Sequence, residues 1–417
     1  MAHILQALRH VGNSRDEHLL AAEPVDSLCL SLGIVFRDRL LTPLVTVRLF
    51  LLQLLSGNTS ITDLRQLSGI DFAPSSYCEA RLRLPLRLVR LLLQWTIQQA
   101  RSLGEHAIGP RVLIVDASSF SMPDTPSLRG RFGLPRGRGV KEGVTYPLAK
   151  FIGLIDQASG LFVDCLCGTL YRHEMGLVAS LHPALRIGDI LLGDRAFCSF
   201  AHVALLNARG VLACFHLHQG RPIPAGKKSQ RWNKPPRCPV WLDARVFALM
   251  PAVIDVRIVA LSCPRRGFRT KVVYIATTLP DDAIWTDEKV AELYGHRWQI
   301  ETCFDHLKTT MNSAVLKCKT VGGIVREHLM YLLAYNLARL TMLRWALQNG
   351  VSAWRVSFVD AMRYLKVRLL GLPGVENLRL VPLRPGRYEP RVIRRRMKEY
   401  DLLTEPRNAR KQREKQG

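Results

Sequence analysis

RVLIVD, residues 111–116, is a short apolar run, rich in β-branched residues, that ends on a carboxylate. A run of this length and composition predicts a buried β-strand. DILLGD, residues 189–194, repeats the pattern and also ends on an aspartate. Two buried strands that each deliver a carboxylate at the C-terminal end are typical of the ligand-binding edge of an α/β fold. The two stretches therefore predict an α/β domain with Asp116 and Asp194 as candidate site residues.

Further strand patterns lie on both sides of Asp194. LAKFIGLID and LFVDCLCGTL precede it, separated by the turn residues QASG, and a helix is expected near 174–186. The runs VLACFHLH, VFALM, VIDVRIVALS and TKVVYIATTL follow it and predict a β-rich insertion. The boundaries that we expect are a helical DNA-binding region over 1–105, the first part of the α/β core over 106–204, the insertion over 205–283, the rest of the core over 284–350 and a basic C-terminal region over 351–417.

The region before residue 105 shows helical periodicity and little strand signal. We expect helices near 43–56 and 60–68, and a third from about Ser76. Ser60 with Asp63 resembles a capping box, and Ser75 or Ser76 is a good N-cap residue. Three short helices separated by tight turns fit a helix-turn-helix-like unit, and they fit a plain helical bundle equally well.

The stretch YGHRWQIETCFDHLK, residues 294–308, predicts an amphipathic helix. At about 100° per residue, Tyr294, Arg297, Glu301 and Lys308 fall within roughly 60° of arc on one face. At about 1.5 Å per residue, the first and last of them lie roughly 21 Å apart. The face therefore suits contacts along an extended ligand, although a solvated helix face with incidental charges is an equally good interpretation of the four residues alone.

The charge of the chain indicates a polyanionic partner. The 59 Lys and Arg residues outnumber the 34 Asp and Glu residues, which gives a net charge of +25. RGRFGLPRGRGVK, residues 129–141, contains five basic residues and no acidic one, and the tail 384–417 contains twelve basic and five acidic residues. Nucleic acid is the commonest partner of so basic a protein.

The cysteines and the apolar segments favour a cytoplasmic protein, in bacteria one associated with the nucleoid. None of the ten cysteines forms a C-x-x-C pair, and most lie in apolar runs, as buried thiols do. The stretch MAHILQALRHVGNSRDE lacks the apolar core of a signal peptide. LLTPLVTVRLFLLQLL, residues 40–55, is interrupted by Pro43 and Arg48 and is short for a membrane span.

Asp116, Asp194 and Glu301 come from two strands and one helix of a strongly basic protein. Clustered carboxylates repel one another, and a bound divalent cation is the usual way to keep them all ionised. Two magnesium ions held by such a cluster can support an in-line phosphoryl displacement. Arg297, Lys308 and the hydroxyl of Tyr294 would then contact the phosphodiester backbone.

Two other carboxylates compete for these roles. Asp189 follows Gly188, and this pair is typical of the turn that enters a strand, so we rank Asp189 below Asp194. Asp305 lies only about 40° from Glu301 on an ideal helical wheel, and geometry alone does not separate the two.

These residues resemble a known family. The spacing Y-x2-R-x3-E-x6-K of Tyr294, Arg297, Glu301 and Lys308 resembles the signature of the DDE transposases of the insertion sequence 4 family. VDASSFSMPDTP and LLGDRAF resemble the first and second aspartate segments of that family, in the same order. The resemblance extends over nearly the whole chain. One departure is Ala117, because Asp-Ala-Ser stands where Asp-Gly-Thr is common.

The resemblance implies a ribonuclease-H-like core and two Mg²⁺ ions on Asp116, Asp194 and Glu301, with Mn²⁺ as a substitute. It implies binding of terminal inverted repeats, then DNA strand cleavage and strand transfer in cut-and-paste transposition. Because one site per chain must serve two DNA ends, we expect a homodimer in the DNA complex.

Other interpretations stay open at this point. A metal-dependent nuclease without strand transfer and a catalytically inactive DNA-binding relic would share these residues. The tryptophans of the insertion region could stack on an extruded base, although core packing is the more common role for Trp232, Trp241 and Trp285. PAGKKS, residues 224–229, lacks the glycine spacing of an ATP-binding phosphate loop.

Overall fold

The computed structural model describes residues 22–36, 39–103, 109–135, 145–221, 223, 229–262, 272–374, 377–383, 409, 412–413 and 416. The basic stretch expected over 129–141 therefore lies outside the described residues from 136 onward. Nearly all of the basic tail 384–417 and the segment PAGKK, residues 224–228, lie outside them as well.

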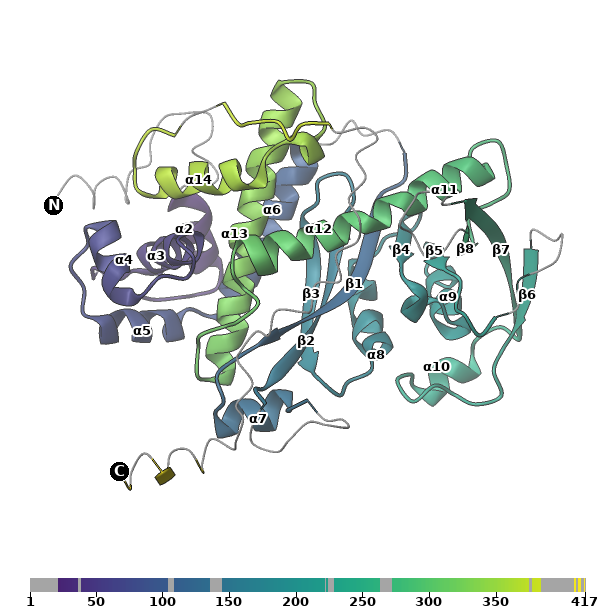
Figure 1. Cartoon of the computed structure of the whole chain (residues 1–417), viewed down its shortest axis with the longest axis horizontal. Coiled ribbons are helices and arrows are strands. Elements are labelled where there is room, and N and C mark those ends of the chain that lie inside the picture. The colour runs from purple at the N-terminus through teal and green to yellow at the C-terminus, as the bar shows by residue number, and fades with distance from the viewer. Residues whose placement is uncertain are drawn as a thin grey trace.

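One mixed sheet forms the centre of the fold (Figure 1). Its eight strands follow the order β3-β2-β1-β4-β5-β8-β7-β6. β1 pairs antiparallel with β2 and parallel with β4, and β4 pairs parallel with β5. The strands are β1 (Val112–Ser121), β2 (Leu148–Asp156), β3 (Phe162–Thr169), β4 (Ile190–Gly193), β5 (Leu212–His216), β6 (Ser229–Asn233), β7 (Val253–Ser262) and β8 (Val272–Thr277).

β1 is longer than the apolar run RVLIVD predicts. We expected the strand to end on Asp116, but it continues for five more residues to Ser121. The continuation is stabilised by β2, which pairs with β1 from Leu113 as far as Ser121. Asp116 therefore lies within a strand, and the prediction that it marks the strand end was wrong because sheet pairing extends polar residues that have no strand signal of their own.

The region expected as an insertion extends the same sheet. β8, β7 and β6 add to the edge of β5 through antiparallel pairs. VFALM, which we expected as a strand, is part of the short helix α10 (Ala244–Ala248). Asp243 caps this helix by accepting hydrogen bonds from the backbone N–H groups of Arg245 and Val246. A short apolar run is compatible with a strand and with a helix. Here the N-cap residue Asp243, which precedes the run, favours the helix.

The remaining helices pack on the sheet or flank it. α13 (Val321–Gln348) is the long apolar helix predicted near 324–347, and it contacts α3, α6, α14 and β3. α12 (Gln299–Asp305) contacts β1. Together with α11, it runs as one rod across the front of the sheet in Figure 1. The other helices are α7 (Pro126–Phe132), α8 (Glu174–Val178), α9 (Phe200–Asn207), α11 (Asp287–Gly295) and α14 (Phe358–Leu369).

The sheet separates two apolar cores because successive residues of a strand point to opposite faces. Ile114 and Phe151 face the core that α13 and the N-terminal helices share. Leu113 and Val115 face a second core, built with α8 and α9. Asp116 lies two residues after Ile114, so its side chain is on the same face of the sheet as that of Ile114. This face is directed toward α12.

The hairpin between β2 and β3 is attached to α13 by buried polar groups. Asn336 donates to the carbonyl of Phe162 and accepts from its N–H group. Arg339 donates to the carbonyl of Ser159 through both Nε and Nη2. These contacts satisfy the polar groups of two side chains that are completely buried, and they fix the hairpin against the helix.

The N-terminal region is helical, as predicted. Ser60 caps α4 by accepting from the N–H group of Asp63, so the predicted capping box is present. The predicted caps Ser75 and Ser76 are wrong, since the helix begins at Pro74, which needs no N–H partner at this position. The five helices are α2 (Ala22–Ser31), α3 (Pro43–Leu55), α4 (Ile61–Ser68), α5 (Pro74–Arg83) and α6 (Leu86–Leu103).

The stretch 294–308 is helical throughout but is not one ideal α-helix. α11 ends at Gly295, a 3-10 turn covers His296–Trp298, α12 follows, and a π-helical turn covers His306–Thr310. The N–H group of Met311 donates to the carbonyl of His306, five residues earlier. Lys308 lies in this π-helical turn. The prediction that it shares a face with Tyr294, Arg297 and Glu301 assumed about 100° per residue, and this value does not apply there.

None of the helices in the described ranges is both long and apolar enough to cross a membrane. The run 40–55, which we expected to be a buried helix, forms α3, in which every residue from Leu44 to Leu55 is buried.

Candidate active site

Strand register brings Asp116 and Asp194 to the same level of the sheet. The β1–β4 ladder ends at the pair Ile114 and Leu192. Asp116 lies two residues beyond Ile114, and Asp194 lies two residues beyond Leu192, so both project from the same face of neighbouring parallel strands. Because β4 ends at Gly193 while β1 continues, the two carboxylates lie where the strands separate.

Each aspartate has one oxygen engaged by the backbone. Oδ1 of Asp116 accepts from the N–H group of Ala117 at 2.7 Å. Oδ1 of Asp194 accepts from the N–H group of Ala196 at 2.8 Å and so caps the 3-10 turn Arg195–Phe197. Among the described residues, the Oδ2 atoms of both aspartates have no hydrogen-bond donor, which leaves one oxygen of each available for a ligand.

Asp116 is electrostatically coupled to the other two predicted carboxylates. The pKa of Asp116 is raised to about 6. Burial is the main cause, and the nearby charges of Asp194 and Glu301 add to it, while the N–H group of Ala117 and the charge of Arg297 act in the opposite direction. The coupling shows that the structure brings Asp116, Asp194 and Glu301 into one electrostatic neighbourhood. Asp305, the rival on α12, is exposed and is not among the groups that shift this pKa.

Glu301 is held by the arginine one turn before it. Nη2 of Arg297 donates to Oε1 of Glu301 at 2.9 Å, and the Glu301 side chain is 45% exposed. Arg297 itself is buried. Burial lowers its pKa, but its interactions with Tyr294, Glu301 and Asp116 outweigh that effect and leave the pKa raised. Arg297 therefore remains charged, in contact with Glu301 and within electrostatic reach of Asp116.

The other two members of the predicted tetrad differ in accessibility. Tyr294 is buried, and its hydroxyl is hydrogen-bonded with Arg297. Burial raises the pKa of Tyr294, so the hydroxyl keeps its proton. Lys308 is half-buried in the π-helical turn. The structure thus groups Tyr294, Arg297 and Glu301 closely, with Lys308 about two turns further along the rod.

Asp189 is placed at the opposite end of β4 from Asp194. It is buried and forms an ion pair with Arg111, whose Nε donates to Oδ1 at 3.0 Å. Its other oxygen accepts from the N–H group of Arg186 at 2.7 Å. These contacts give Asp189 a structural role in the turn that enters the strand.

Sequence reasoning missed His216, the last residue of β5. Gly193 pairs with Phe215, so the residues that follow them, Asp194 and His216, lie side by side on neighbouring strands. Burial lowers the pKa of His216, and so do the charges of Arg195 and Arg297, while Asp194 acts in the opposite direction. The apolar run VLACFHLH predicts a strand without indicating which of its two histidines faces the carboxylates; only the register shows it.

The donor set suits a hard divalent cation, because each of the three carboxylates has an oxygen without a hydrogen-bond donor among the described residues. The same part of the chain contains no group of three His, Cys, Asp or Glu side chains close enough together to hold a metal ion. In this arrangement Oε1 of Glu301 accepts from Arg297. The residues fit a divalent metal in kind, and the Arg297–Glu301 ion pair competes with it.

The tryptophans are packed as core residues. Trp232 is buried in the core that lies behind β4 and β5, with the guanidinium of Arg221 3.5 Å from its ring centroid. Trp241 packs against that core, and Trp285 packs against the other one.

Comparisons with known proteins identify the family of this chain. The profile of a family described as "Transposase DDE domain" matches residues 107–337, which include all six predicted site residues. The chain is 26% identical over 354 residues to the transposase InsG for insertion sequence element IS4 of Escherichia coli (strain K12), covering 79% of this chain and 78% of that protein. It is also 26% identical over 141 residues to the putative transposase InsZ of the same organism, covering 33% of this chain and 47% of that protein.

Among solved structures, the piggyBac transposase synaptic complex with hairpin DNA aligns with a TM-score of 0.48 and 12% sequence identity. The alignment covers 88% of this chain and 80% of that chain.

Proposed function

This chain belongs to the transposase DDE domain family, and on that premise we propose that it binds the terminal inverted repeats of an insertion sequence and moves it by cut-and-paste transposition. The protein is a transposase, an enzyme that cleaves DNA strands and joins them to other DNA. The observation that carries the proposal is the placement of Asp116 and Asp194 on neighbouring parallel strands, electrostatically coupled to Glu301 on the helix above them. We propose that strands β3-β2-β1-β4-β5 form a ribonuclease-H-like core.

Members of this family generally use divalent metal ions, and we assign Mg²⁺ to Asp116, Asp194 and Glu301, with Mn²⁺ as a substitute. When bound, two such ions activate the attacking oxygen and stabilise the leaving oxygen of an in-line displacement. In the cleavage step, a bond forms between water and phosphorus and the bond to the 3′ oxygen breaks, which leaves a 3′-OH end. In strand transfer, that 3′-OH forms the new bond to a phosphorus of the target DNA, and the bond from this phosphorus to the 3′ oxygen of the target strand breaks, which leaves a 3′-OH on the target.

The cationic residues prepare the site for the phosphodiester. A DNA phosphate offers Arg297 an alternative partner to Glu301, because a guanidinium binds phosphate and carboxylate oxygens with the same geometry. Binding of DNA therefore releases Glu301 toward the aspartates. Lys308 adds a second positive charge along the strand. Tyr294, which we predicted to contact DNA, is buried, and its hydrogen bond favours a role in positioning Arg297.

His216 adds a hydrogen-bond donor on the other side of the aspartates. Its lowered pKa favours the neutral imidazole at neutral pH, which has one N–H group to donate. Its place beside Asp194 favours donation to a phosphate oxygen of the strand that is cut.

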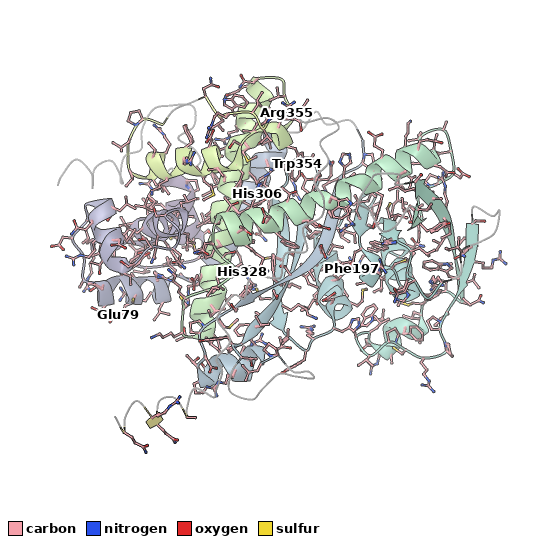
Figure 2. All side chains as sticks on the ribbon, in the orientation of Figure 1. Glu79, Phe197, His306, His328, Trp354 and Arg355 are labelled. Carbon is pink, nitrogen blue, oxygen red and sulfur yellow. The ribbon has the colours of Figure 1, made fainter. Side chains whose placement is uncertain are left out.

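Two further parts of the molecule complete the function. The helices α4 and α5, joined by a turn that contains Gly69 in a left-handed conformation, form the helix-turn-helix-like unit that we assign to the terminal repeat. Glu79 lies on the outer surface of α5 (Figure 2). A homodimer on DNA supplies one catalytic site for each transposon end.

Variants of the carboxylates test the proposed chemistry. Asp116→Ala, Asp194→Ala and Glu301→Ala should each reduce cleavage of a labelled terminal-repeat duplex by more than about 100-fold, since loss of a residue that only supports a metal ligand already costs about 10–100-fold. Binding of the duplex should be largely retained. Asp305→Ala, on the same helix, is the matched control and should cleave normally.

The outcomes separate the alternatives. Substantial cleavage by Glu301→Ala together with a loss in Asp305→Ala would show that Asp305 is the third carboxylate. A pre-cleaved duplex with a 3′-OH end tests strand transfer by itself. Efficient cleavage without any transfer of that end would identify a nuclease, and DNA binding without cleavage at any divalent metal concentration would identify an inactive relic.

A further inference from the structure

A cavity of about 520 Å³ lies at the junction between the N-terminal helices and the α/β core. α3 and α5 form one wall, and the segment 317–320 with the first turns of α13 forms the other. We call this cavity the junction pocket. Its volume is within the range of ligand sites. None of the residues assigned to catalysis above lines it.

The junction pocket carries a net positive charge. Four cationic side chains line it, and its one carboxylate, Glu327, is buried. Both oxygens of Glu327 are already occupied, by the amide of Asn58 and by the backbone N–H groups of Lys317 and Cys318. Within the described residues, no ion pair joins any of the four cations to a carboxylate. The cations are Arg81, Lys317, Lys319 and Arg326.

The cations are oriented by neutral groups. The guanidinium of Arg81 lies 3.9 Å from the centroid of the Phe50 ring and donates to Oε1 of Gln53 at 3.3 Å. Arg326 donates from Nε to the carbonyl of Leu84 at 2.6 Å. These contacts position the charges without neutralising them, so an anion that enters the pocket meets a preorganised set of donors.

Part of the wall is apolar. Ile61 and Leu82 contribute carbon surface beside the cations. A ligand that matches both features has an anionic group next to an apolar ring or chain. The sugar–phosphate unit of a nucleic acid has this character, and contacts to phosphate and sugar make up half or more of the hydrogen bonds in protein–DNA complexes.

The pocket is connected to the catalytic site by a continuous element. The N–H group of Ser121 donates to the carbonyl of Ala314 at 2.9 Å, and the N–H group of Leu316 donates to the carbonyl of Ser121 at 2.9 Å. Lys317 and Lys319 follow directly. Ser121 lies five residues beyond Asp116 on β1, which is roughly 17 Å at about 3.4 Å per residue.

On the basis of the proposed transposase function, we propose that the junction pocket binds the sugar–phosphate backbone of one strand of the DNA duplex, at a place separate from the catalytic carboxylates. The phosphate lies among the four cations, and the deoxyribose lies against the apolar wall. Because α5 and α13 both line the pocket, one DNA strand held there connects the helical region to the core. The pocket thereby sets which phosphodiester reaches Asp116.

Cys78 provides a direct test, since it lines the pocket and is exposed. The rate of its alkylation by iodoacetamide is measured by peptide mass spectrometry in the full chain, with Ca²⁺ present so that bound duplex is not cut. A saturating terminal-repeat duplex should slow the reaction at least tenfold, and dissociation of the duplex by salt should restore the rate. An unchanged rate in the DNA complex overturns the proposal.

Deoxyadenosine monophosphate, at the same concentration of nucleotide, distinguishes a free nucleotide from a DNA strand. We expect it to leave the alkylation rate of Cys78 unchanged. Protection by the mononucleotide equal to that by the duplex would make this a site for free nucleotides and would overturn the proposal for DNA.

Charge reversal supplies a second, independent measurement. Lys319→Glu and Lys317→Glu should each lower the affinity for the duplex about tenfold. Each should also reduce the slope of log affinity against log salt concentration by the amount that corresponds to about one phosphate contact. Lys289→Glu, an equal change of charge at an exposed position of α11, is the matched control and should have little effect. Equal losses in all three variants would indicate general electrostatics and would overturn the proposal.

The proposal and the proposed function fail in different ways. If Asp116→Ala abolishes cleavage while Cys78 reacts equally fast with and without bound duplex, the transposase function stands and the assignment of the junction pocket falls. If the duplex protects Cys78 but Asp116→Ala cleaves normally, the pocket assignment stands and the catalytic assignment falls.

Discussion

Asp116 shows how burial and neighbouring charge act on a single residue. Its carboxyl group is removed from water on the face of the sheet that α12 covers, and both effects disfavour its charged form. The folded chain therefore binds a proton at Asp116 more tightly than the unfolded chain does. The catalytic arrangement is thus formed at a cost in stability that a bound cation would offset.

Because the raised pKa of Asp116 destabilises the folded chain where the carboxyl group is ionised, it gives a prediction for the stability of the metal-free protein. The pKa of Asp116 is raised from 3.8 to about 6. The destabilisation of the folded chain by this carboxylate is therefore absent below about pH 4, grows between about pH 4 and pH 6, and is complete above about pH 6. Asp116→Asn keeps the Oδ1 acceptor and removes the charge. We expect this variant to be more stable than the parent at pH 8, by up to about 3 kcal/mol, and by about half as much at pH 5.

Urea unfolding of both proteins at the two pH values, with chelator present, measures the difference. A difference in free energy of unfolding that does not change with pH would show that Asp116 titrates normally in the folded chain.

His216 gives a second prediction at this scale. If its N–H group contacts the DNA strand, His216→Ala should reduce the rate of cleavage by about 10- to 100-fold, and His216→Gln, which retains a side-chain N–H donor, should recover part of the loss. His218, two residues further on, is exposed and is the matched control. Single-turnover cleavage measures all three variants. Equal effects of His216→Ala and His218→Ala would exclude a specific role of His216.

At the scale of elements, the rod from α11 to the π-helical turn determines which side chains meet the sheet. Its 3-10 turn places Arg297 close to both Tyr294 and Glu301, and its π-helical turn changes the direction of Lys308. His306, labelled in Figure 2, begins that turn. Its ring stacks on that of Phe358 of α14, with ring centroids 4.3 Å apart. Packing against α14 therefore favours a wider turn at this point than an isolated helix would adopt.

The hairpin between β2 and β3 supports a prediction about the contact between sheet and helix. Gly160 has a φ of +71°, and a Cβ atom there would collide with the guanidinium of Arg339. Gly160→Ala should therefore lower the free energy of unfolding by about 3 kcal/mol or more, from backbone strain and from displacement of a buried arginine.

Gly350→Ala is the matched control, because Gly350 has a φ of +64° but no atom within 4 Å of its ideal Cβ position. It should cost only about 1 kcal/mol of strain. Denaturant unfolding measures both variants. Equal losses would show that Arg339 adjusts freely and does not fix the hairpin.

At the scale of the whole molecule, the net charge of +25 sets the interaction with DNA. Phosphate contacts release counterions, so affinity for any duplex should fall steeply as salt rises. The described cationic groups include those of the junction pocket and of the tetrad. If both proposals hold, a bound duplex contacts both groups.

The single site per chain predicts the composition of the active complex. Two transposon ends must be cut and joined together, so a complex with paired ends should contain two chains. The molecular mass of the protein with paired terminal-repeat duplexes, measured by light scattering, checks this. The protein without DNA is the reference. One chain per pair of ends in an active complex would contradict the prediction.

The sequence alone determined the local features of this protein. Apolar runs predicted β2, β3, β4 and β7, periodicity predicted α3, α4 and α13, and the pair Ser60 and Asp63 predicted a cap, because each of these signals depends on residues that are close in the chain. The three carboxylates were singled out because they stand at the ends of such runs and within a spaced motif.

Only the tertiary structure decided how these features combine. The continuation of β1 beyond Asp116, the placement of His216 beside Asp194 and the extension of the sheet by β8, β7 and β6 all depend on pairing between strands that are distant in the chain. The same is true of the junction pocket, whose walls come from residues more than 200 positions apart. Pairing and packing of this kind are selected by the free energy of the whole fold, and no local pattern encodes them.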